Sequence, residues 1–468
     1  MQCRTVSAPS HAPCVLHLPV KQTMRIPLYS AFLGLLLSLT LFAANANTGT
    51  IASASPFARH LDGSVPHILK TIEPGELSNS VYPPPADATI DYFVIESRIE
   101  DNTTNGIFCL LARPADGSPA YQTKPYPAIL LLHGGGSSGL QQRTAALAWA
   151  TRGYVVLAPD LPGIANAKST PHSAGGWTRL PYGERRWTVS PSITSSTIYQ
   201  TIAAALDAFA LLRTRSDVDA ARIGITGISW GGYTTTMLCG LLGPQVRAGF
   251  SNYGCGFYED TTFNRALSHL TVANRATWLA QLDAGRRAPG IAAPFFIAGA
   301  TNDAYFYPPA VERTLAAIPG QAVSRVYAPN ADHQLPIPGG VTQTGGAAAM
   351  AEQWFAWHLQ GRGAEFPVIT LEPVAADAVA TKVRFCIKSP RPIKTVFLVS
   401  SLPPKEGGWP KRKWEKQAVL PVPPVNGATR YEATLSGDIA THPGAAWFIL
   451  ASDNRPVSVS SPIIIHPE

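Results

Sequence analysis

Short apolar runs alternate with stretches of helical periodicity along most of the chain, and this alternation limits the fold more than any other feature. Each run fits a strand that is buried on both faces, and each stretch between runs spaces its apolar residues as an amphipathic helix does. The predicted strands are 128–132, 154–158, 222–226, 246–250, 293–298 and 323–328, and the predicted helices are 141–152, 196–213, 234–242, 309–318 and 346–360. This order predicts an α/β domain with a mostly parallel sheet and helices on both faces.

The chain on either side of this alternation has a different pattern. Residues 47–88 are loop-like, and the α/β domain, which opens with a predicted hairpin, spans 89–362. Beyond a glycine-containing linker, apolar residues recur at every second position, which predicts a small immunoglobulin-like β-sandwich over 368–468. This second domain could bind polysaccharide through Trp409 and Trp414, or it could brace the first domain. We expect its removal to leave the candidate active site chemically complete.

The amino-terminal region carries a predicted export signal. Residues 24–46 combine a basic start, an apolar stretch and a small-x-small end, which is typical of a signal peptide cleaved after Ala46. Residues 1–23 are interpreted as translation from an upstream start. The apolar stretch is short for a spanning helix, so we expect a periplasmic or secreted protein with no stable membrane span after cleavage.

Charge and cysteine content exclude some classes of protein. The formal net charge is +7, and loss of the three basic residues in 1–46 reduces it to +4, which does not indicate a nucleic-acid partner. Four cysteines follow the signal, too few for a disulfide framework in so long a chain. Cys239 and Cys255 could pair, or all four could be free thiols. No Cys/His spacing indicates a metal site.

The stretch Gly227-Ile-Ser-Trp-Gly231 places Ser229 between a predicted strand and a predicted helix. The G-x-S-x-G pattern is weak by itself. In this context it predicts a tight turn that projects the serine hydroxyl above the sheet, with glycines permitting close approach of the neighbouring backbone. The Trp230 amide, at the helix start, would point to where an oxyanion forms.

A second glycine-rich stretch, His133-Gly-Gly-Gly136, directly follows the predicted strand 128–132. Its exposed amides are suited to complete an oxyanion hole beside Ser229. We assign this role to Gly134 and Gly135, and we expect His133 to brace the loop.

A serine hydroxyl needs a base, and in this architecture an acid and then a histidine follow the nucleophile along the chain. His333 follows the last predicted strand of the sheet, and Asp303 follows the strand before it. We therefore predict Ser229 as nucleophile, His333 as base and Asp303 as the acid that orients the imidazole. Asp332 is the rival acid, although its side chain should point away from the ring.

These motifs resemble those of α/β-hydrolase-fold esterases of the dienelactone hydrolase and bacterial acetyl xylan esterase type. The matching stretches are 131–136, 152–161, 222–233, 253–257, 301–303, the loop with His333, and 412–415. The resemblance implies an α/β-hydrolase fold and the same triad, and it implies hydrolysis of short acyl esters of carbohydrate such as xylan through an acyl-enzyme. It implies no cofactor.

The substrate is open between a small-molecule ester and a polysaccharide ester, and two further features of the sequence bear on it. The Ser-Trp-Gly-Gly-Tyr run also looks like prolyl-oligopeptidase catalytic domains, so a serine peptidase acting on short peptides is the alternative. Long irregular segments at 162–194 and 258–289 would lie over the carboxyl ends of the strands, where ligands bind in open sheets. Their tryptophans Trp177, Trp187 and Trp278 are candidate sugar-stacking surfaces.

Overall fold

The structure is a computed structural model that describes residues 55–77, 82–117, 124–320, 323–333, 345–372, 382–425 and 428–467. The predicted export signal at 24–46 lies outside these residues. Residues 49–468 form one compact unit. In the described ranges, no helix combines the length and apolar character needed to cross a membrane.

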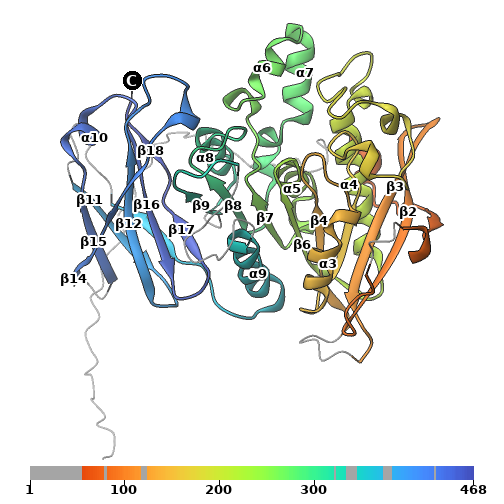
Figure 1. The fold of residues 1–468 in the computed structure, drawn as a ribbon, viewed down its shortest axis with the longest axis horizontal. Coiled ribbons are helices and arrows are strands. Elements are labelled where there is room, and N and C mark those ends of the chain that lie inside the picture. The colour runs from red at the N-terminus through yellow and green to blue at the C-terminus, as the bar shows by residue number, and fades with distance from the viewer. Residues whose placement is uncertain are drawn as a thin grey trace, which may run out of the picture. The chain divides into compact units, whose positions relative to one another are not determined.

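A large mixed sheet forms the core of the α/β domain (Figure 1). Within the described residues it has nine strands in the order β1-β2-β3-β5-β4-β6-β7-β8-β9. The strands are β1 Ile68–Thr71, β2 Ala88–Glu100, β3 Thr103–Pro114, β4 Tyr126–Leu132, β5 Val155–Pro159, β6 Val218–Ile228, β7 Ala248–Asn252, β8 Phe295–Ala300 and β9 Val323–Ala328. The strands from β5 to β9 in this order are parallel, and β1, β2 and β3 are antiparallel. The predicted mostly parallel sheet is confirmed.

Strand β1 lies in the segment 47–88 that was predicted to be loop-like. It pairs antiparallel with β2 at the edge of the sheet, and all four of its residues are exposed. A short exposed edge strand has no buried face to impose an alternating pattern, so the sequence gives no signal for it.

Helices cover both faces of the sheet. The larger helices are α3 Arg143–Ala150, α4 Thr197–Thr214, α5 Trp230–Leu242, α7 Val272–Leu282, α8 Pro308–Ala316 and α9 Gly345–Gln360, and the shorter ones are α2 Ala58–Leu61, α6 Asn264–Ser268 and α10 Gly437–Thr441. A Cβ on Gly224 of β6 would meet Phe355 and Leu359 of α9, whereas a Cβ on Gly249, paired with Ile225, would meet Cys239 of α5. Because successive strand residues point to opposite faces, α5 and α9 lie on opposite sides.

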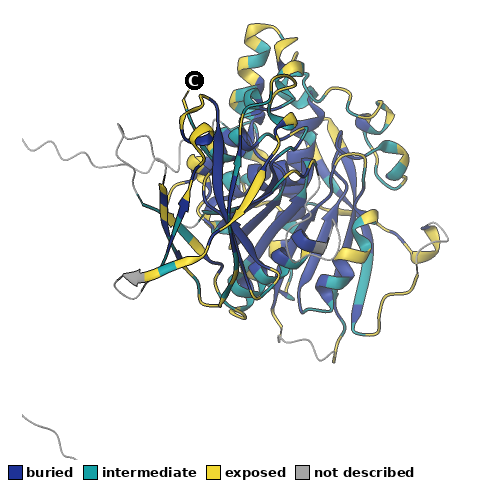
Figure 2. Cartoon of the chain, turned by 60° about the vertical axis from the view of Figure 1, so that its left-hand side comes forward, coloured by how far each residue is buried: buried dark blue, intermediate teal, exposed yellow. Residues whose placement is uncertain are grey.

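Most residues of the central strands are buried, as the continuous apolar runs predicted (Figure 2). Every residue of β4, β5 and β8 is buried. A fully buried sheet holds the ends of its strands in fixed positions, and this makes their carboxyl edge a rigid platform for side chains.

The carboxyl-terminal region forms the predicted β-sandwich. Its strands are β10 Val368–Leu371, β11 Lys382–Lys388, β12 Ile393–Ser401, β13 Glu415–Ala418, β14 Pro421–Val425, β15 Ala428–Thr434, β16 Ala446–Asp453, β17 Ser458–Ser460 and β18 Ile464–Ile465. One sheet has the order β10-β11-β15-β14, and the other has β13-β12-β16-β17 with β18 beside β16. All of these pairings are antiparallel.

The sandwich packs along β9, the edge strand of the large sheet, and β17 lies beside it in Figure 1. Ser460 Oγ accepts a hydrogen bond of 3.0 Å from the Tyr327 amide, and Glu312 Oε1 accepts one of 3.1 Å from the Ile463 amide. The rings of Tyr327 and Phe448 meet edge to face at 5.8 Å. The sandwich thereby covers an edge that would otherwise present unpaired backbone groups.

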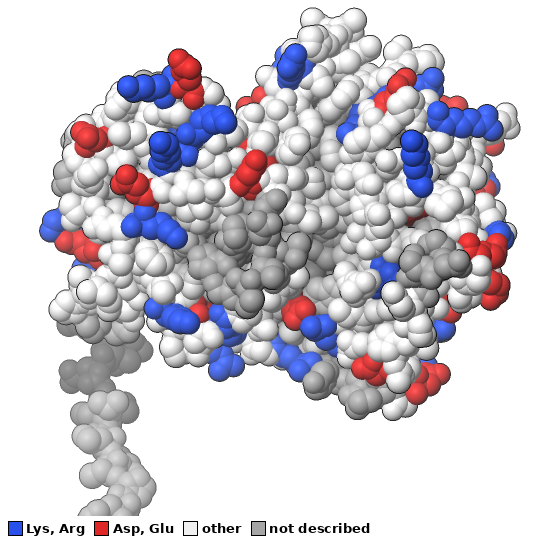
Figure 3. All heavy atoms as spheres, in the orientation of Figure 1, with Lys and Arg blue, Asp and Glu red and all other residues white. Residues whose placement is uncertain are grey.

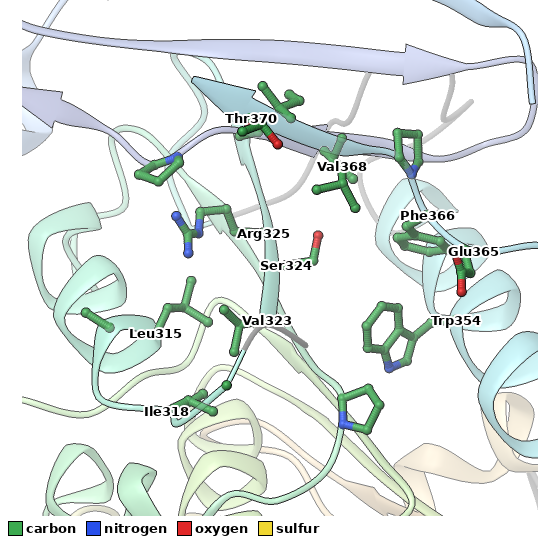
Figure 4. Close-up of a pocket in the computed structure, with 18 of the residues that line it drawn as sticks. Leu315, Ile318, Val323, Ser324, Arg325, Trp354, Glu365, Phe366, Val368 and Thr370 are labelled. Carbon is green, nitrogen blue, oxygen red and sulfur yellow. The ribbon is translucent and has the colours of Figure 1, made fainter. Parts of the chain in front are cut away.

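A cavity of about 720 Å³ lies between the two domains (Figure 4). Its lining includes Leu315, Val323, Arg325, Trp354 and Phe366. Pro294 and Val323, at the amino-terminal starts of β8 and β9, also face it. Ser229 follows the carboxyl-terminal end of β6, so this cavity lies at the opposite edge of the sheet from the candidate nucleophile.

The four cysteines of the described chain are free thiols. Cys109, Cys239 and Cys255 are buried and Cys386 is half-buried. The conceivable Cys239–Cys255 disulfide is not formed. Burial raises the pKa of the Cys109, Cys239 and Cys255 thiols, which keeps them protonated and unreactive.

Basic and acidic side chains are interspersed on the face of the molecule drawn in Figure 3. The expectation that the chain has no nucleic-acid partner remains a prediction.

Candidate active site

Ser229 stands on the turn between β6 and α5, with φ of 58° and ψ of −118°. A positive φ is strained for a serine, so the surrounding contacts must hold it in place. A Cβ on Gly227 would lie 2.5 Å from the Gly231 carbonyl oxygen, and one on Gly231 would lie 2.3 Å from the Leu132 carbonyl oxygen. Only glycine fits at these positions, and the turn leaves Ser229 half-buried and within reach of solvent.

The structure brings the three predicted triad residues together. His333 Nε2 lies 2.8 Å from Ser229 Oγ, and His333 Nδ1 lies 2.9 Å from Asp303 Oδ2. A proton on Nδ1 can bond to the carboxylate, which leaves the Nε2 lone pair to accept the serine proton. The arrangement is that of a nucleophile, a base and an orienting acid.

Asp303 is fixed by the backbone of its own loop. Its side chain is fully buried, and its Oδ1 accepts hydrogen bonds from the amides of Tyr305, at 2.7 Å, and Phe306, at 2.9 Å. These bonds occupy one carboxylate oxygen and turn the other toward His333.

Asp332, the rival acid, does not contact the imidazole through a hydrogen bond. Its Oδ1 accepts from the amides of Ala304 and His333, at 2.8 and 2.7 Å. As expected, its side chain points away from the ring. It instead ties the loop of Asp303 to the loop of His333.

The glycine-rich loop after β4 lies directly against the nucleophile. A Cβ on Gly134 would be 3.6 Å from Ser229 Cβ, and one on Gly135 would be 3.2 Å from Trp230 Cδ1. The amide of Gly136 donates a hydrogen bond to the carbonyl oxygen of Ile164, in the segment that follows β5. The assignment of Gly134, Gly135 and Trp230 as oxyanion donors remains a prediction, and the proximity of the loop to Ser229 supports it.

His133 braces this loop. It is buried, its Nε2 accepts a hydrogen bond of 3.0 Å from the Leu161 amide, and its Nδ1 lies 2.8 Å from the Gly134 carbonyl oxygen. Burial lowers the pKa of His133 from 6.5 to about 4, although the bond to Gly134 opposes this. The ring is therefore neutral at physiological pH, with its proton on Nδ1.

The predicted sugar-stacking role is wrong for Trp177 and Trp278. Trp177 is 3% exposed and Trp278 is fully buried, so neither ring has a face open to a ligand. Trp187 is half-buried, with its ring centroid 4.9 Å from that of Trp278 and 6.1 Å from that of Trp230. Long insertions need an apolar core of their own, and these large rings supply it behind the nucleophile turn.

Tyrosines form the exposed aromatic surface at the site. Tyr305 is 46% exposed, and its ring meets that of His333 edge to face at 4.8 Å. Tyr182 is 50% exposed, and a Cβ on Gly135 would lie 2.4 Å from its hydroxyl. Tyr253, directly after β7, is buried, and its ring centroid lies 4.4 Å from that of His333. No pattern in the sequence singles out these residues, although Tyr305 follows Asp303 by only two positions.

Comparison with known proteins gives a family and a set of distant structural neighbours. Residues 116–334 match the dienelactone hydrolase family. No curated protein matches the chain. Acetyl xylan esterase 1 from Thermoanaerobacterium sp. JW/SL YS485 is 17% identical, covering 61% of this chain and 88% of its own, with a TM-score of 0.45.

Two further solved structures are also distantly similar. The acetyl xylan esterase from Paenibacillus sp. R4 is 17% identical, covering 60% of this chain and 88% of its own, with a TM-score of 0.45. The acylaminoacyl peptidase from Pyrococcus horikoshii is 17% identical, covering 58% of this chain and 42% of its own, with a TM-score of 0.43. The match to the dienelactone hydrolase family spans most of the α/β domain, and this chain is a hydrolase of the α/β-hydrolase fold.

Proposed function

We propose that the chain is an exported serine esterase that cleaves short acyl esters, such as acetyl groups on carbohydrate, through an acyl-enzyme. The observation that carries the proposal is the hydrogen-bonded chain from Ser229 Oγ to His333 Nε2, at 2.8 Å, and from His333 Nδ1 to Asp303 Oδ2, at 2.9 Å. A serine within hydrogen-bond reach of a base that an acid orients is the requirement for nucleophilic catalysis.

The proposed reaction has two halves. Ser229 Oγ attacks the ester carbonyl carbon while its proton passes to His333 Nε2, and the amides of Trp230 and the Gly134–Gly135 loop bind the oxyanion. The intermediate then expels the alcohol, which takes the proton from His333 and leaves the acyl group on Ser229. A water molecule then attacks the acyl carbonyl carbon while its proton passes to His333. The second intermediate releases the carboxylic acid product, and Ser229 Oγ takes the proton back from His333.

Carbohydrate esters are proposed from two observations. The sequence resembles acetyl xylan esterases in the stretches that carry the triad. In addition, the exposed rings of Tyr305 and Tyr182 flank the site, and amphipathic rings of this kind are suited to stack on sugar faces. Export is proposed from the signal-like residues 24–46.

The test is hydrolysis by protein that begins at residue 47, with Ser229→Ala as the blank. Substrates are p-nitrophenyl esters of increasing acyl length, acetylated xylan and a peptidyl anilide. We expect a preference for acetyl esters and release of acetate from xylan. Cleavage of the anilide with weak ester turnover would favour the peptidase alternative. A preference for long acyl chains would retain the mechanism and refute the substrate.

A further inference from the structure

We propose that the sandwich segment 409–414 is a positioning element for catalysis, which holds the loops of Asp303 and His333 at their working separation. The inference rests on the proposed function, because it assumes that Ser229, His333 and Asp303 react as a triad. It gives the second domain a role in turnover, distinct from binding polysaccharide.

The segment first holds the loop that bears Asp303. The Trp409 indole N–H donates a hydrogen bond of 2.9 Å to the Thr301 carbonyl oxygen. Asn302 Nδ2 donates to the carbonyl oxygens of Pro410, at 2.9 Å, and Arg412, at 2.6 Å. The two residues immediately before Asp303 are thus both bound to the sandwich.

The same segment holds the loop that bears His333. Asn330 Nδ2 donates a hydrogen bond of 2.7 Å to the Trp414 carbonyl oxygen, and the Trp414 amide donates one of 2.8 Å to Asn330 Oδ1. The Asn330 side chain therefore pairs with the Trp414 backbone as a neighbouring strand would. Asn330 has φ of 58°, so these bonds also hold a left-handed turn three residues before His333.

Further bonds join the two loops to each other. The Asn330 amide donates to Thr301 Oγ1 at 2.8 Å, and the Asn302 amide donates to the Ala331 carbonyl oxygen at 2.9 Å. Asp332 adds its bond to the Ala304 amide. The two loops and the segment form one hydrogen-bonded unit. A shift of the segment would therefore change the distance between Asp303 and His333.

The segment itself is anchored in the sandwich. Arg412 is only 7% exposed, and its guanidinium lies 4.3 Å from the Trp409 ring centroid and donates a hydrogen bond of 2.8 Å to the Gly444 carbonyl oxygen. Trp414 is 4% exposed, and its ring packs against Phe448 of β16 at 5.5 Å. A segment fixed from behind in this way can impose its geometry on the loops.

The position of the loops explains why they need such support. They follow β8 and β9, and β9 is the edge strand of the large sheet among the residues that the structure describes, so no further strand of this part of the chain supports its loop. An error of about 1 Å in a catalytic geometry can cost about 10²-fold in rate. The contacts therefore argue against the expectation that removing 368–468 leaves the site chemically complete, since five hydrogen bonds to the two loops would be lost.

The test uses Trp409→Phe in the full chain, which removes the N–H donor to Thr301 and keeps a ring against Arg412. Trp447→Phe is the matched control, because Trp447 is a buried sandwich tryptophan of β16 whose indole N–H has no partner in the described structure. Asn302→Ala is the second test variant. Each is compared with wild type for kcat, KM, the pH dependence of kcat/KM, and thermal unfolding.

We expect Trp409→Phe and Asn302→Ala to lower kcat by about 10- to 100-fold with KM changed less than about twofold. The midpoint of the acidic limb of kcat/KM should move to lower pH, because a misaligned Asp303 stabilises the imidazolium less. Trp447→Phe should change stability alone. The proposal is overturned if Trp409→Phe and Trp447→Phe lose the same activity, or if the pH profile does not move.

Failure of the proposed function would have a different signature. Wild type would then hydrolyse none of the esters tested. The positioning role would still be measured from the rate at which a fluorophosphonate labels Ser229. Slower labelling in Trp409→Phe than in Trp447→Phe would support it, and equal rates would refute it.

Discussion

Ser229 and its partners differ from ordinary polar residues in how completely their neighbours fix them. The serine holds a positive φ, Asp303 is fully buried with one oxygen bound by two amides, and His333 bridges the two. Two carboxylates lie near the imidazole of His333: Asp332 precedes it in the sequence, and Asp303 contacts it in space. Their hydrogen bonds distinguish their roles. Asp303 contacts the ring, and Asp332 contacts backbone amides.

This difference predicts opposite outcomes for the same substitution at the two acids. Asp303→Asn should lower kcat by about 10³–10⁴-fold, because an amide cannot stabilise the imidazolium and favours the wrong tautomer. Asp332→Asn should stay within a few-fold of wild type, since its Oδ1 can still accept from Ala304 and His333. Steady-state kinetics on p-nitrophenyl acetate checks both. The reverse ranking would make Asp332 the catalytic acid.

His133 predicts a pH dependence of stability. Its folded pKa of about 4 lies below the unfolded value of 6.5, so the unfolded chain binds a proton that the folded protein excludes between these values. The contribution of His133 to the free energy of unfolding is therefore fully present above about pH 6.5. It decreases as the pH falls toward about 4, by at most about 3 kcal/mol. His133→Gln, which keeps an acceptor for the Leu161 amide, should flatten this loss.

Urea unfolding of both proteins at several pH values between 4 and 7.5 measures the effect. The difference between the two curves isolates the contribution of His133, because all other titratable groups are common to both proteins. Parallel curves would show that folding does not lower the pKa of His133, and would refute the prediction.

At the scale of elements, the turn from β6 to α5 depends on close backbone approach rather than on side chains. The loop after β4 passes so near that Leu132 and His133 carbonyl oxygens lie 2.3 and 2.7 Å from any Cβ on Gly231. Backbone atoms of a buried strand cannot move aside as a flexible side chain does. The glycine-rich loop after β4 and the turn that bears Ser229 are therefore packed as one unit.

Gly231→Ala should consequently disrupt both stability and turnover. We expect a loss of about 1–3 kcal/mol or more in the free energy of unfolding, and a lower kcat in the protein that still folds. Gly176→Ala is the control, because a Cβ there meets nothing within 4 Å and the φ is not positive. Thermal unfolding and ester hydrolysis check the pair. Equal effects of the two substitutions would contradict the packing argument.

At the scale of the whole molecule, the two domains share an interface that runs along β9 and reaches the active-site loops. Ser460 and Ile463 of the sandwich bind groups of the α/β domain, and Trp409 and Trp414 bind the loops beyond β8 and β9. A region joined in this way should unfold cooperatively with its partner. The sandwich is then part of the enzyme's folded core rather than an appended module.

Ser460→Ala tests this coupling far from Ser229. It leaves the buried Tyr327 amide without its acceptor, which costs about 1–3 kcal/mol. We expect a lower Tm for the whole chain and a matching loss in the heat resistance of esterase activity. Ser389→Ala, in an exposed turn of the sandwich, should leave both unchanged. Two separate transitions, with activity following only one, would show independent domains.

The sequence determined the α/β alternation, the sandwich and the candidate triad, because each leaves a local signature. Buried parallel strands are continuous apolar runs, and the nucleophile turn needs its glycines in adjacent positions. The chain order of Ser229, Asp303 and His333 follows from which strand ends they occupy. These features depend on neighbours in sequence, so they are visible without a structure.

Tertiary structure alone decided how side chains are used. Trp278 is buried where the two insertions meet, and its indole N–H donates to the Arg186 carbonyl oxygen. Trp177 is buried as well, and no local pattern distinguishes such a tryptophan from one that meets a ligand. Asn302 and Asn330 bind a segment about 100 residues further along the chain, and their partners are backbone groups that carry no sequence signal. Long-range packing between the domains selects these contacts, and that packing is a property of the folded chain.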